Sequence, residues 1–441
     1  MLNVLKGGKD LKRENDNEIS LLGRIVIKIR SVTARLKSKR VFASLFEREK
    51  RLALYDGPES SEESKLSYGL GIARIISVIL LVCLLIVTLL FGSGAISYEK
   101  VYYMFKDIGY VKSYGESAPS TLNYSMPVQN QDFAVFKNGL AVAGDSEIKM
   151  FTATGRMTMT EGSEFTNPRI SASNEYILVY DQGRRGYAVY NSFISVKREN
   201  LDFPISYADM AENGSFLLVT SSKSYASLVK IYNSSLDLVS EYSKNDRVIS
   251  ASLSSDGRYA AVLSLSAKNG EALSTLSVID ARSSDIKYSV SFNGYMPYTC
   301  EFLSDDRIAV ILDTKAVVFD RGGAQRSEFV YPGKLSRFDI YGGRFALLFS
   351  DGSGSQKNTV AVFNKDGTPV FNGAIDGTVR DMKLSSSAVC FLKSGEIVRV
   401  STSLGTQSRA KTVSDKASLL VFSDGQVALC TQTTARYISF D

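Results

Sequence analysis

The fold of this chain is decided by Ile249-Ser-Ala-Ser-Leu-Ser-Ser-Asp-Gly-Arg-Tyr-Ala-Ala-Val-Leu263, followed by Leu276-Ser-Val-Ile-Asp280. Two strand-like segments flank a Ser-Ser-Asp-Gly turn, and a third apolar segment ends at an aspartate. An Asp-Gly pair between such segments is a strong signal for a tight turn between antiparallel strands. The unit is therefore predicted to form part of an antiparallel sheet.

The same unit recurs along the chain. Two further copies are Phe302-Leu-Ser-Asp-Asp-Arg-Ile-Ala-Val310 with Ala316-Val-Val-Phe-Asp320, and Val421-Phe-Ser-Asp-Gly-Gln-Val-Ala-Leu429 with Ala435-Arg-Tyr-Ile-Ser439. The first apolar residue after each turn marks eight copies, at steps of 36 to 49 residues: Leu140, Tyr176, Phe216, Tyr259, Ile308, Phe345, Val389 and Val427. A period of roughly 40 residues with about four strands per unit is typical of β-propeller blades.

The ends of the repeat predict how the ring closes. The last copy reaches Asp441 after three strands, and a spare strand, 121–126, precedes the first copy. Pairing these ends would complete a blade and remove an exposed sheet edge. We therefore expect an all-β, eight-bladed, WD40- or quinoprotein-like propeller over residues 119–441, with seven blades as the alternative. A pair of β-sandwiches would not repeat one pattern eight times.

Several turn and strand motifs also carry a family resemblance. They are Asn167-Pro168, Leu178-Val-Tyr-Asp-Gln-Gly183, Tyr187-Ala-Val-Tyr190 and Ser264-Leu-Ser-Ala-Lys-Asn-Gly-Glu271. Residues from about 66 to 441 resemble a family of membrane-anchored bacterial β-propellers whose domain has unknown function. The resemblance implies the fold and a single membrane anchor, and it implies no activity.

A hydrophobic segment precedes the propeller. From Ile75 to Phe91, 14 of 17 residues are Ile, Leu, Val or Phe. Starting at Ile72 the segment covers 20 residues, enough to cross roughly 30 Å of hydrocarbon as a helix. We expect an uncleaved transmembrane helix over residues 71–94, followed by a stem over 95–118. A buried core helix is the less favoured interpretation, because an apolar run of this length is rare in soluble proteins.

The positive charge of the chain lies in its N-terminal tail. Residues 1–74 hold 16 Lys and Arg against 10 Asp and Glu, and the remaining residues hold 36 of each sign. A basic tail favours a cytoplasmic N-terminus and a propeller outside the bacterial cell membrane. The basic residues close to the segment, Lys65 and Arg74 before it and Lys100, Lys106 and Lys112 after it, do not decide the orientation.

Part of the tail has helical periodicity. Apolar residues between 22 and 36 recur at helical spacing, with Arg24, Lys28 and Arg35 among the basic residues between them. Residues 19–46 are therefore predicted to form an amphipathic helix on anionic lipid headgroups, with a solvated basic helix as an equal alternative. A lipid surface suits this basic segment better than a nucleic acid does. Residues 56–65 read as an acidic linker within the tail, 1–70.

Composition excludes much chemistry. The chain has no histidine and no tryptophan, so Ser-His-Asp catalysis and histidine-ligated metal sites are absent, and a quinone-dependent dehydrogenase is disfavoured. We expect no metal and no cofactor. Of four cysteines, Cys83 lies in the hydrophobic segment. Cys300, Cys390 and Cys430 lie in apolar strand contexts, which favours buried thiols over a disulfide.

The candidate binding residues are arginines. Arg169, Arg247, Arg337 and Arg380 fall near the start of predicted innermost strands, and Arg184 and Arg185 fall in a loop between strands. Together they would suit carboxylate or phosphate groups, and a solvated rim balanced by aspartates is the alternative.

We therefore expect a non-catalytic, membrane-anchored, extracytoplasmic module that binds a protein or an envelope polymer. A carboxylate-dependent polysaccharide hydrolase remains the alternative function, because two blades of a propeller can bring an Asp and a Glu together.

Overall fold

The computed structural model describes residues 77–78, 81, 120–126, 130–350, 357–411, 417–422, 426–438 and 440. The chain divides into two compact units, Met1–Ser93 and Gly94–Asp441. The predicted tail, amphipathic helix, acidic linker and stem lie outside the described residues. Within the predicted membrane span, Ser77, Val78 and Leu81 are described, and all three are helical. In the part of the chain that is described, no helix has the length and apolar character needed to cross a bilayer.

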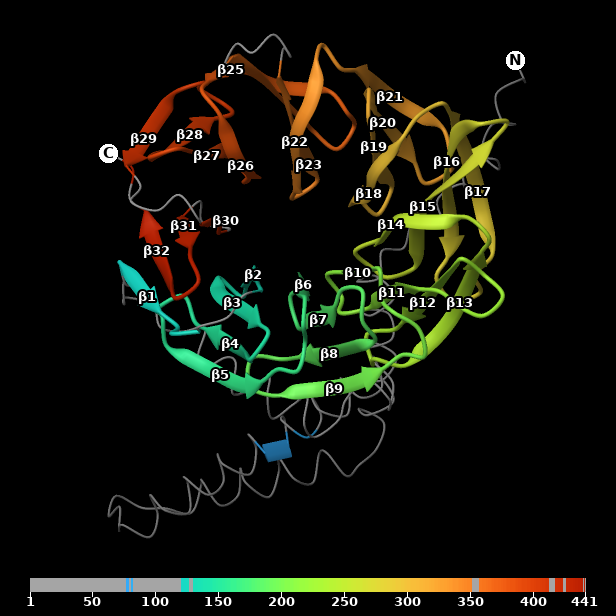
Figure 1. Cartoon of the computed structure of the whole chain (residues 1–441), viewed down its shortest axis with the longest axis horizontal. Coiled ribbons are helices and arrows are strands. Elements are labelled where there is room, and N and C mark those ends of the chain that lie inside the picture. The colour runs from blue at the N-terminus through green and yellow to red at the C-terminus, as the bar shows by residue number, and fades with distance from the viewer. Residues whose placement is uncertain are drawn as a thin grey trace, which may run out of the picture. The chain divides into compact units, whose positions relative to one another are not determined.

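The second unit is a ring of eight four-stranded antiparallel sheets around a central opening (Figure 1). The prediction of an all-β, eight-bladed propeller is confirmed. Each blade begins with its innermost strand and ends with its outermost strand, except for the last blade.

The blades are numbered here in chain order, and their strands are as follows. Blade 1 holds β2 (Gln131–Phe136), β3 (Gly139–Gly144), β4 (Glu147–Phe151) and β5 (Met157–Gly162); blade 2 holds β6 (Pro168–Ala172), β7 (Ile177–Asp181), β8 (Gly186–Tyr190) and β9 (Ser195–Asn200); blade 3 holds β10 (Tyr207–Met210), β11 (Phe216–Thr220), β12 (Ser227–Tyr232) and β13 (Leu238–Lys244); blade 4 holds β14 (Arg247–Leu253), β15 (Tyr259–Lys268), β16 (Glu271–Asp280) and β17 (Ile286–Asn293). Blade 5 holds β18 (Pro297–Ser304), β19 (Arg307–Leu312), β20 (Lys315–Asp320) and β21 (Gln325–Val330); blade 6 holds β22 (Lys334–Tyr341), β23 (Arg344–Ser350), β24 (Lys357–Phe363) and β25 (Pro369–Asp376); blade 7 holds β26 (Val379–Leu384), β27 (Ala388–Lys393), β28 (Glu396–Ser401) and β29 (Gln407–Lys411); blade 8 holds β30 (Ser418–Val421), β31 (Val427–Cys430), β32 (Thr434–Ile438) and β1 (Thr121–Asn123).

The stretch that decides the fold forms β14, β15 and β16 of blade 4. In the turn between β14 and β15, the hydroxyl of Ser254 donates to Asp256 and accepts hydrogen bonds from the amides of Arg258 and Tyr259. Gly257 has a φ of +68°, and a Cβ there would lie 2.7 Å from the Ser215 hydroxyl. The turn therefore needs glycine for its backbone conformation and for its close approach to blade 3.

The turns from the third to the fourth strand share a hydrogen-bonding pattern. In blades 1 to 7 the residue that opens this turn is Thr152, Asn191, Asn233, Asp280, Asp320, Asn364 or Ser401, and its side-chain oxygen accepts a hydrogen bond from a backbone amide two to four residues later. Short polar side chains of this kind stabilise turns by replacing a backbone acceptor. The aspartate or asparagine expected at the end of the third strand thus has a structural role.

The core lies between neighbouring blades. The rings of Phe216 and Tyr232 in blade 3 stack at 4.3 Å, and Tyr187 of blade 2 packs against both at about 6 Å. All three side chains are buried. Because each sheet buries both faces against its neighbours, the middle strands read as nearly continuous apolar segments.

The ring closes as the sequence predicts. Strand β1 pairs with β32, so that the outermost strand of blade 8 comes from the N-terminal side of the propeller. The buried hydroxyl of Tyr124 binds the carbonyl oxygens of Thr431 and Thr434. This closure joins the two ends of the domain in one sheet, so that neither β1 nor β32 is left as an unpaired strand.

Candidate functional site: the seam between blades 5 and 6

The innermost strands are joined by a series of hydrogen bonds from one blade to the next. In each, an Asp or Ser side chain accepts from a backbone amide of the following innermost strand. The pairs, at 2.6 to 3.3 Å, are Asp132 with Ile170, Ser171 with Met210, Asp209 with Leu253, Ser252 with Phe302, Asp339 with Leu384 and Asp381 with Leu419. Blades 8 and 1 are joined instead by the Gln131 amide, which donates to the Gln432 carbonyl at 2.8 Å.

The seam between blades 5 and 6, where β18 lies beside β22, has neither kind of contact among the described residues. Ser252 accepts from the amide of Phe302, and the residue before Phe302, Glu301, occupies the position that would accept from blade 6. The carboxylate of Glu301 accepts no hydrogen bond from any described residue. Strands β18 and β22 are also the least closely packed pair of neighbouring innermost strands. At this seam Glu301 therefore lacks the backbone amide of the next innermost strand, to which the corresponding Asp and Ser side chains of other blades are hydrogen-bonded.

The electrostatic environment of Glu301 is unusual. Glu301 retains some solvent-accessible surface, but protein encloses it closely enough that burial, reinforced by Asp209 and Asp339 and opposed by Lys383, raises the pKa of its carboxyl to about 8. Lys383 does not neutralise it directly, because the Lys383 ammonium pairs with Asp339 at 3.3 Å. Glu301 is thus a carboxyl group held partly protonated near neutral pH.

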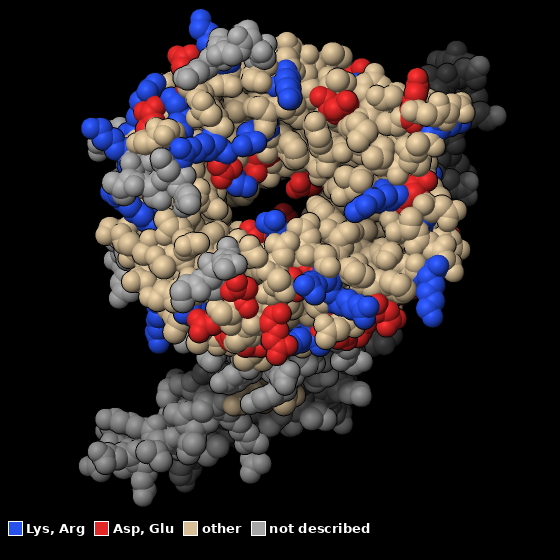
Figure 2. Space-filling model, viewed as in Figure 1, with Lys and Arg blue, Asp and Glu red and all other residues tan. Residues whose placement is uncertain are grey.

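The innermost strands carry several acidic side chains. Asp132, Asp209, Glu301, Asp339 and Asp381 all lie on innermost strands. Burial by itself lowers the pKa of Lys383, but Asp339 and Asp381 outweigh it and leave that pKa raised. Figure 2 shows side chains of both signs around the opening.

The mouth of the seam carries exposed aromatic side chains. Tyr298, near the start of β18, stacks on Phe338 of β22 with ring centroids 6.3 Å apart and planes at 19°. These side chains are 46% and 36% exposed, and neighbouring Met296 is 45% exposed. Arg337, also exposed, precedes Phe338 in the chain. Aromatic residues, methionine and arginine are the residue types most enriched in protein interfaces.

One further group at this end of the seam lacks a partner. Tyr331, in the connection between β21 and β22, packs against Phe329 and Phe349. Its hydroxyl is buried without a hydrogen-bond partner among the described residues. Buried polar groups are nearly always paired in native proteins, so this orphan hydroxyl is a second irregularity of the same seam.

The structure brings two of the six predicted arginines into contact. Nε of Arg337 donates to the carbonyl oxygen of Arg380 at 3.1 Å, across the boundary of blades 6 and 7. Arg169 and Arg247 are exposed at the starts of β6 and β14, and Arg169 donates to the side chain of Gln182 at 3.1 Å. The four arginines lie on innermost strands of different blades: Arg247 is first in β14, Arg169 and Arg380 are second in β6 and β26, and Arg337 is fourth in β22.

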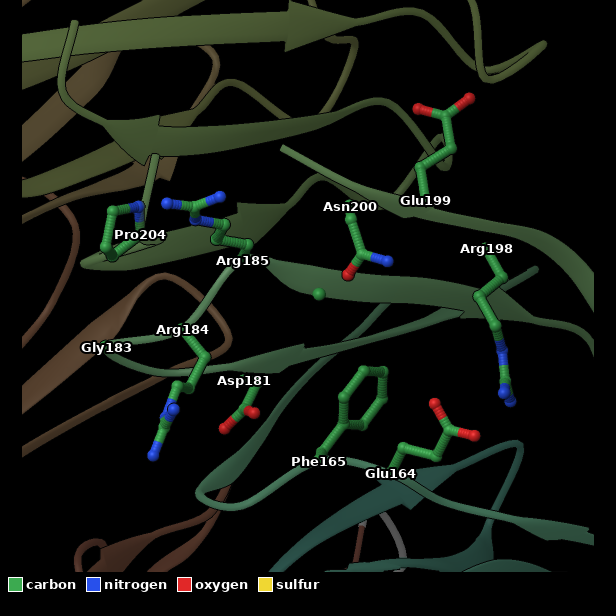
Figure 3. A pocket seen from close by; sticks show the side chains of 11 residues that line it. Glu164, Phe165, Asp181, Gly183, Arg184, Arg185, Arg198, Glu199, Asn200 and Pro204 are labelled. Atoms are coloured by element: carbon green, nitrogen blue, oxygen red, sulfur yellow. The ribbon is translucent and has the colours of Figure 1, made fainter. Parts of the chain in front are cut away.

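Arg184 and Arg185 line a separate surface pocket of 550 Å³ on blade 2. Figure 3 shows their guanidinium groups extending in opposite directions from the loop between β7 and β8. The pocket also contains Asp181, which accepts from the amides of Thr166 and Asn167. Acidic and basic side chains both line this pocket, and the divergent arginines do not form a single anion site.

A second cavity, of 460 Å³, lies at the far end of the seam, where the innermost strands end. Asp209, Glu212 and Glu301 line it, and no lysine or arginine is among its described lining residues. Apolar wall is supplied by Phe302, Leu303 and Ile340. In the described part of the chain, no three Asp, Glu or Cys side chains are grouped closely enough to hold a metal ion.

Sequence reasoning did not single out Glu301, Tyr298 or Phe338. The signal available for Glu301 was a charged residue between Cys300 and Phe302, inside an innermost strand that should alternate apolar and small residues. The stacked pair had no such signal, because its two members lie 40 positions apart on different blades.

The comparisons with known proteins identify the family and the fold. Residues 117–440 match the family of unknown function DUF5711, and the chain belongs to that family. No curated protein matches the sequence.

Among solved structures, BamB from Moraxella catarrhalis is similar with a TM-score of 0.50 and 11% identity, covering 73% of this chain and 98% of that one. The β-propeller domain of Cps50 (Swd1) from Myceliophteria thermophila has a TM-score of 0.45 and 12% identity, covering 66% of this chain and all of that one. The similarity to BamB supports the propeller fold.

Proposed function

We propose that this protein is a non-catalytic binding module that engages a partner protein at the mouth of the blade 5–6 seam. The observation that carries the proposal is the exposed stack of Tyr298 on Phe338, which joins two blades at a seam with no hydrogen bond between its innermost strands. Rigid, partly exposed aromatic side chains lose little conformational entropy on binding and often dominate the affinity of an interface. Arg337 beside them adds a charged group suited to a carboxylate.

The same proposal places the propeller outside the bacterial cell membrane, on a single helix over residues 71–94 with a cytoplasmic tail. Its support is the long apolar segment and the basic tail of the sequence. Protease treatment of intact cells, followed by antibodies to the tail and the propeller, tests this placement. Digestion of the propeller with survival of the tail is expected, and a propeller that survives until the membrane is broken would contradict it.

The carboxylate-dependent hydrolase is less well supported. Glycoside hydrolysis needs one ionised carboxylate beside one carboxylic acid. Burial raises the pKa of both Asp209 and Glu301, and Asp209 already accepts a backbone hydrogen bond from blade 4. Neither Asp209 nor Glu301 is therefore both free of a hydrogen bond and favoured in its ionised form. Release of reducing sugar from envelope polysaccharide by wild type but not by Glu301→Gln would reverse this preference.

The binding proposal is tested with a double variant, Tyr298→Ser with Phe338→Ser. The full chain is used as bait in membrane extracts, and the affinity of a captured protein, once purified, is measured for each variant. The double variant should weaken binding by about tenfold or more, as expected for the loss of aromatic anchors.

The matched control is Ile286→Ser with Val370→Ser, which removes apolar side chains that are 54% and 45% exposed on outermost strands. This control should bind as wild type does. Equal capture by the double variant and wild type would overturn the proposed surface.

A further inference from the structure

We infer that the cavity at the far end of the blade 5–6 seam binds an alkylammonium group, with Glu301 as its anionic anchor. This inference is separate from the proposed partner surface, because neither Tyr298 nor Phe338 lines the cavity. Its ligand would be a polyamine or the lysine side chain of a protein.

The first argument is the free carboxylate. At six of the seven other seams an acidic or hydroxyl side chain accepts a hydrogen bond from a backbone amide, as Asp209 does from Leu253 and Asp339 from Leu384. Glu301 has no such amide and lines the cavity. Glu301 keeps some solvent-accessible surface, so a cation in the cavity would donate the hydrogen bonds that no described residue supplies.

The second argument is the balance of charge. Among the described lining residues, Asp209, Glu212 and Glu301 are acidic and none is basic. The nearest cation that acts on Glu301 is Lys383, which is paired with Asp339. The cavity is thus lined by acidic groups without a basic group among its described residues, which favours a cationic ligand.

The third argument selects the kind of cation. The described acidic side chains are not grouped closely enough to share one metal ion. A cation with several separated charges, or with an alkyl chain behind a single charge, does not need such close grouping. The apolar side chains of Phe302, Leu303 and Ile340 line the same 460 Å³, and they suit the methylene chain of an alkylammonium ion.

The protonation state of Glu301 should make the affinity of the cavity for a cation depend on pH. The charged groups facing Glu301 are Asp209 from β10, Asp339 from β22 and Lys383 from β26, and Tyr207 of β10 also lies near it. Because the carboxyl of Glu301 has a pKa of about 8, a cation that binds at pH 7 should displace its proton. Affinity should therefore rise between pH 6.5 and 8.5.

The test is isothermal titration calorimetry of the purified full chain with two probes, spermidine and Nα-acetyl-lysine amide. Binding of either probe, with proton release at pH 7 measured in two buffers of different ionisation enthalpy, supports the inference. The probe that binds more tightly identifies the source as a free polyamine or a protein side chain. Glu301→Gln should weaken binding by at least about tenfold, the loss expected for one charge-assisted hydrogen bond.

The matched control is Glu175→Gln, which neutralises an exposed acid in the turn between β6 and β7, outside the cavity lining, and should leave binding unchanged. Thermal unfolding confirms that both variants fold. The inference is overturned if neither probe binds at millimolar concentration, if Glu301→Gln binds both probes as wild type does, or if magnesium at equal charge displaces them equally well.

Discussion

The carboxylate of Asp339 on β22 accepts a hydrogen bond of 2.6 Å from the backbone amide of Leu384 on β26. This contact joins blades 6 and 7 from side chain to main chain, and five similar contacts join other pairs of neighbouring blades. The acids inside the opening are therefore mainly structural, and Glu301 is distinguished by lacking this role.

The first prediction concerns that contact. Asp339→Ala should lower the free energy of unfolding by about 1–3 kcal/mol, because it leaves the Leu384 amide without an acceptor and Lys383 without its ion-pair partner. Urea unfolding measures the loss. Asp376→Ala, which removes an exposed acid at the end of β25, should change stability little, and equal losses in the two variants would show that the interblade contact contributes nothing specific.

The second prediction concerns ring closure. Tyr124→Phe removes the hydroxyl that binds the Thr431 and Thr434 carbonyl oxygens and should cost about 1–2 kcal/mol. It should also speed proteolysis near β1, because that strand pairs only with β32. Tyr225→Phe alters an exposed tyrosine, 44% accessible, as the control. Unchanged cleavage near β1 would mean that the hydroxyl does not stabilise the closure.

The third prediction concerns pH. The folded-state pKa of Glu301, about 8, lies above its ordinary value of 4.5, so the folded protein holds this proton more tightly than the unfolded chain does. The contribution of Glu301 to the free energy of unfolding is fully present below about pH 4.5 and is lost as the pH rises through 8. The accumulated loss is about 5 kcal/mol, because the two pKa values differ by about 3.5 and one pKa unit corresponds to about 1.4 kcal/mol.

Glu301→Gln removes this titration. Its advantage in unfolding free energy over wild type should therefore grow from pH 5 to pH 8 and then level off. Urea unfolding of both proteins across that range is the measurement, and parallel curves would contradict the assigned environment of Glu301.

The fourth prediction concerns the thiols. Cys300, Cys390 and Cys430 are buried and free of disulfides. Burial raises the pKa of Cys300 and Cys390 to about 12, and it raises that of Cys430 as well. Since the thiolate is the reactive form, a Cys83→Ser variant should not react with a thiol reagent at pH 8 when folded, and should show three thiols in denaturant. Rapid labelling of the folded protein would contradict the buried placement.

Much of the fold was predictable because it depends on local patterns. The Asp-Gly turn at 256–257 and the alternating strands around it identify one blade, and the spacing of the copies identifies eight. The spare strand near Thr121 and the incomplete last copy predict the closure, because an unpaired edge on each side is unfavourable.

The candidate site was only partly predictable. The starts of the innermost strands could be located, and with them Arg169, Arg247, Arg337 and Arg380. Whether these arginines form one group depends on how blades are placed around the ring, and contacts between blades have no fixed spacing in sequence. The stack of Tyr298 on Phe338 was unpredictable for the same reason, because it is also a contact between blades.

The sequence by itself determined the repeat, the blade count and the closing strand, since these follow from hydrophobic periodicity and turn chemistry within each unit. Only the tertiary structure decided which inner acids are satisfied. Asp209 and Asp339 each meet an amide of the next blade, whereas Glu301, at the corresponding position, meets a cavity. The physical reason is that hydrogen bonding and burial of a side chain on an innermost strand depend on its neighbour across the seam, which the local sequence does not specify.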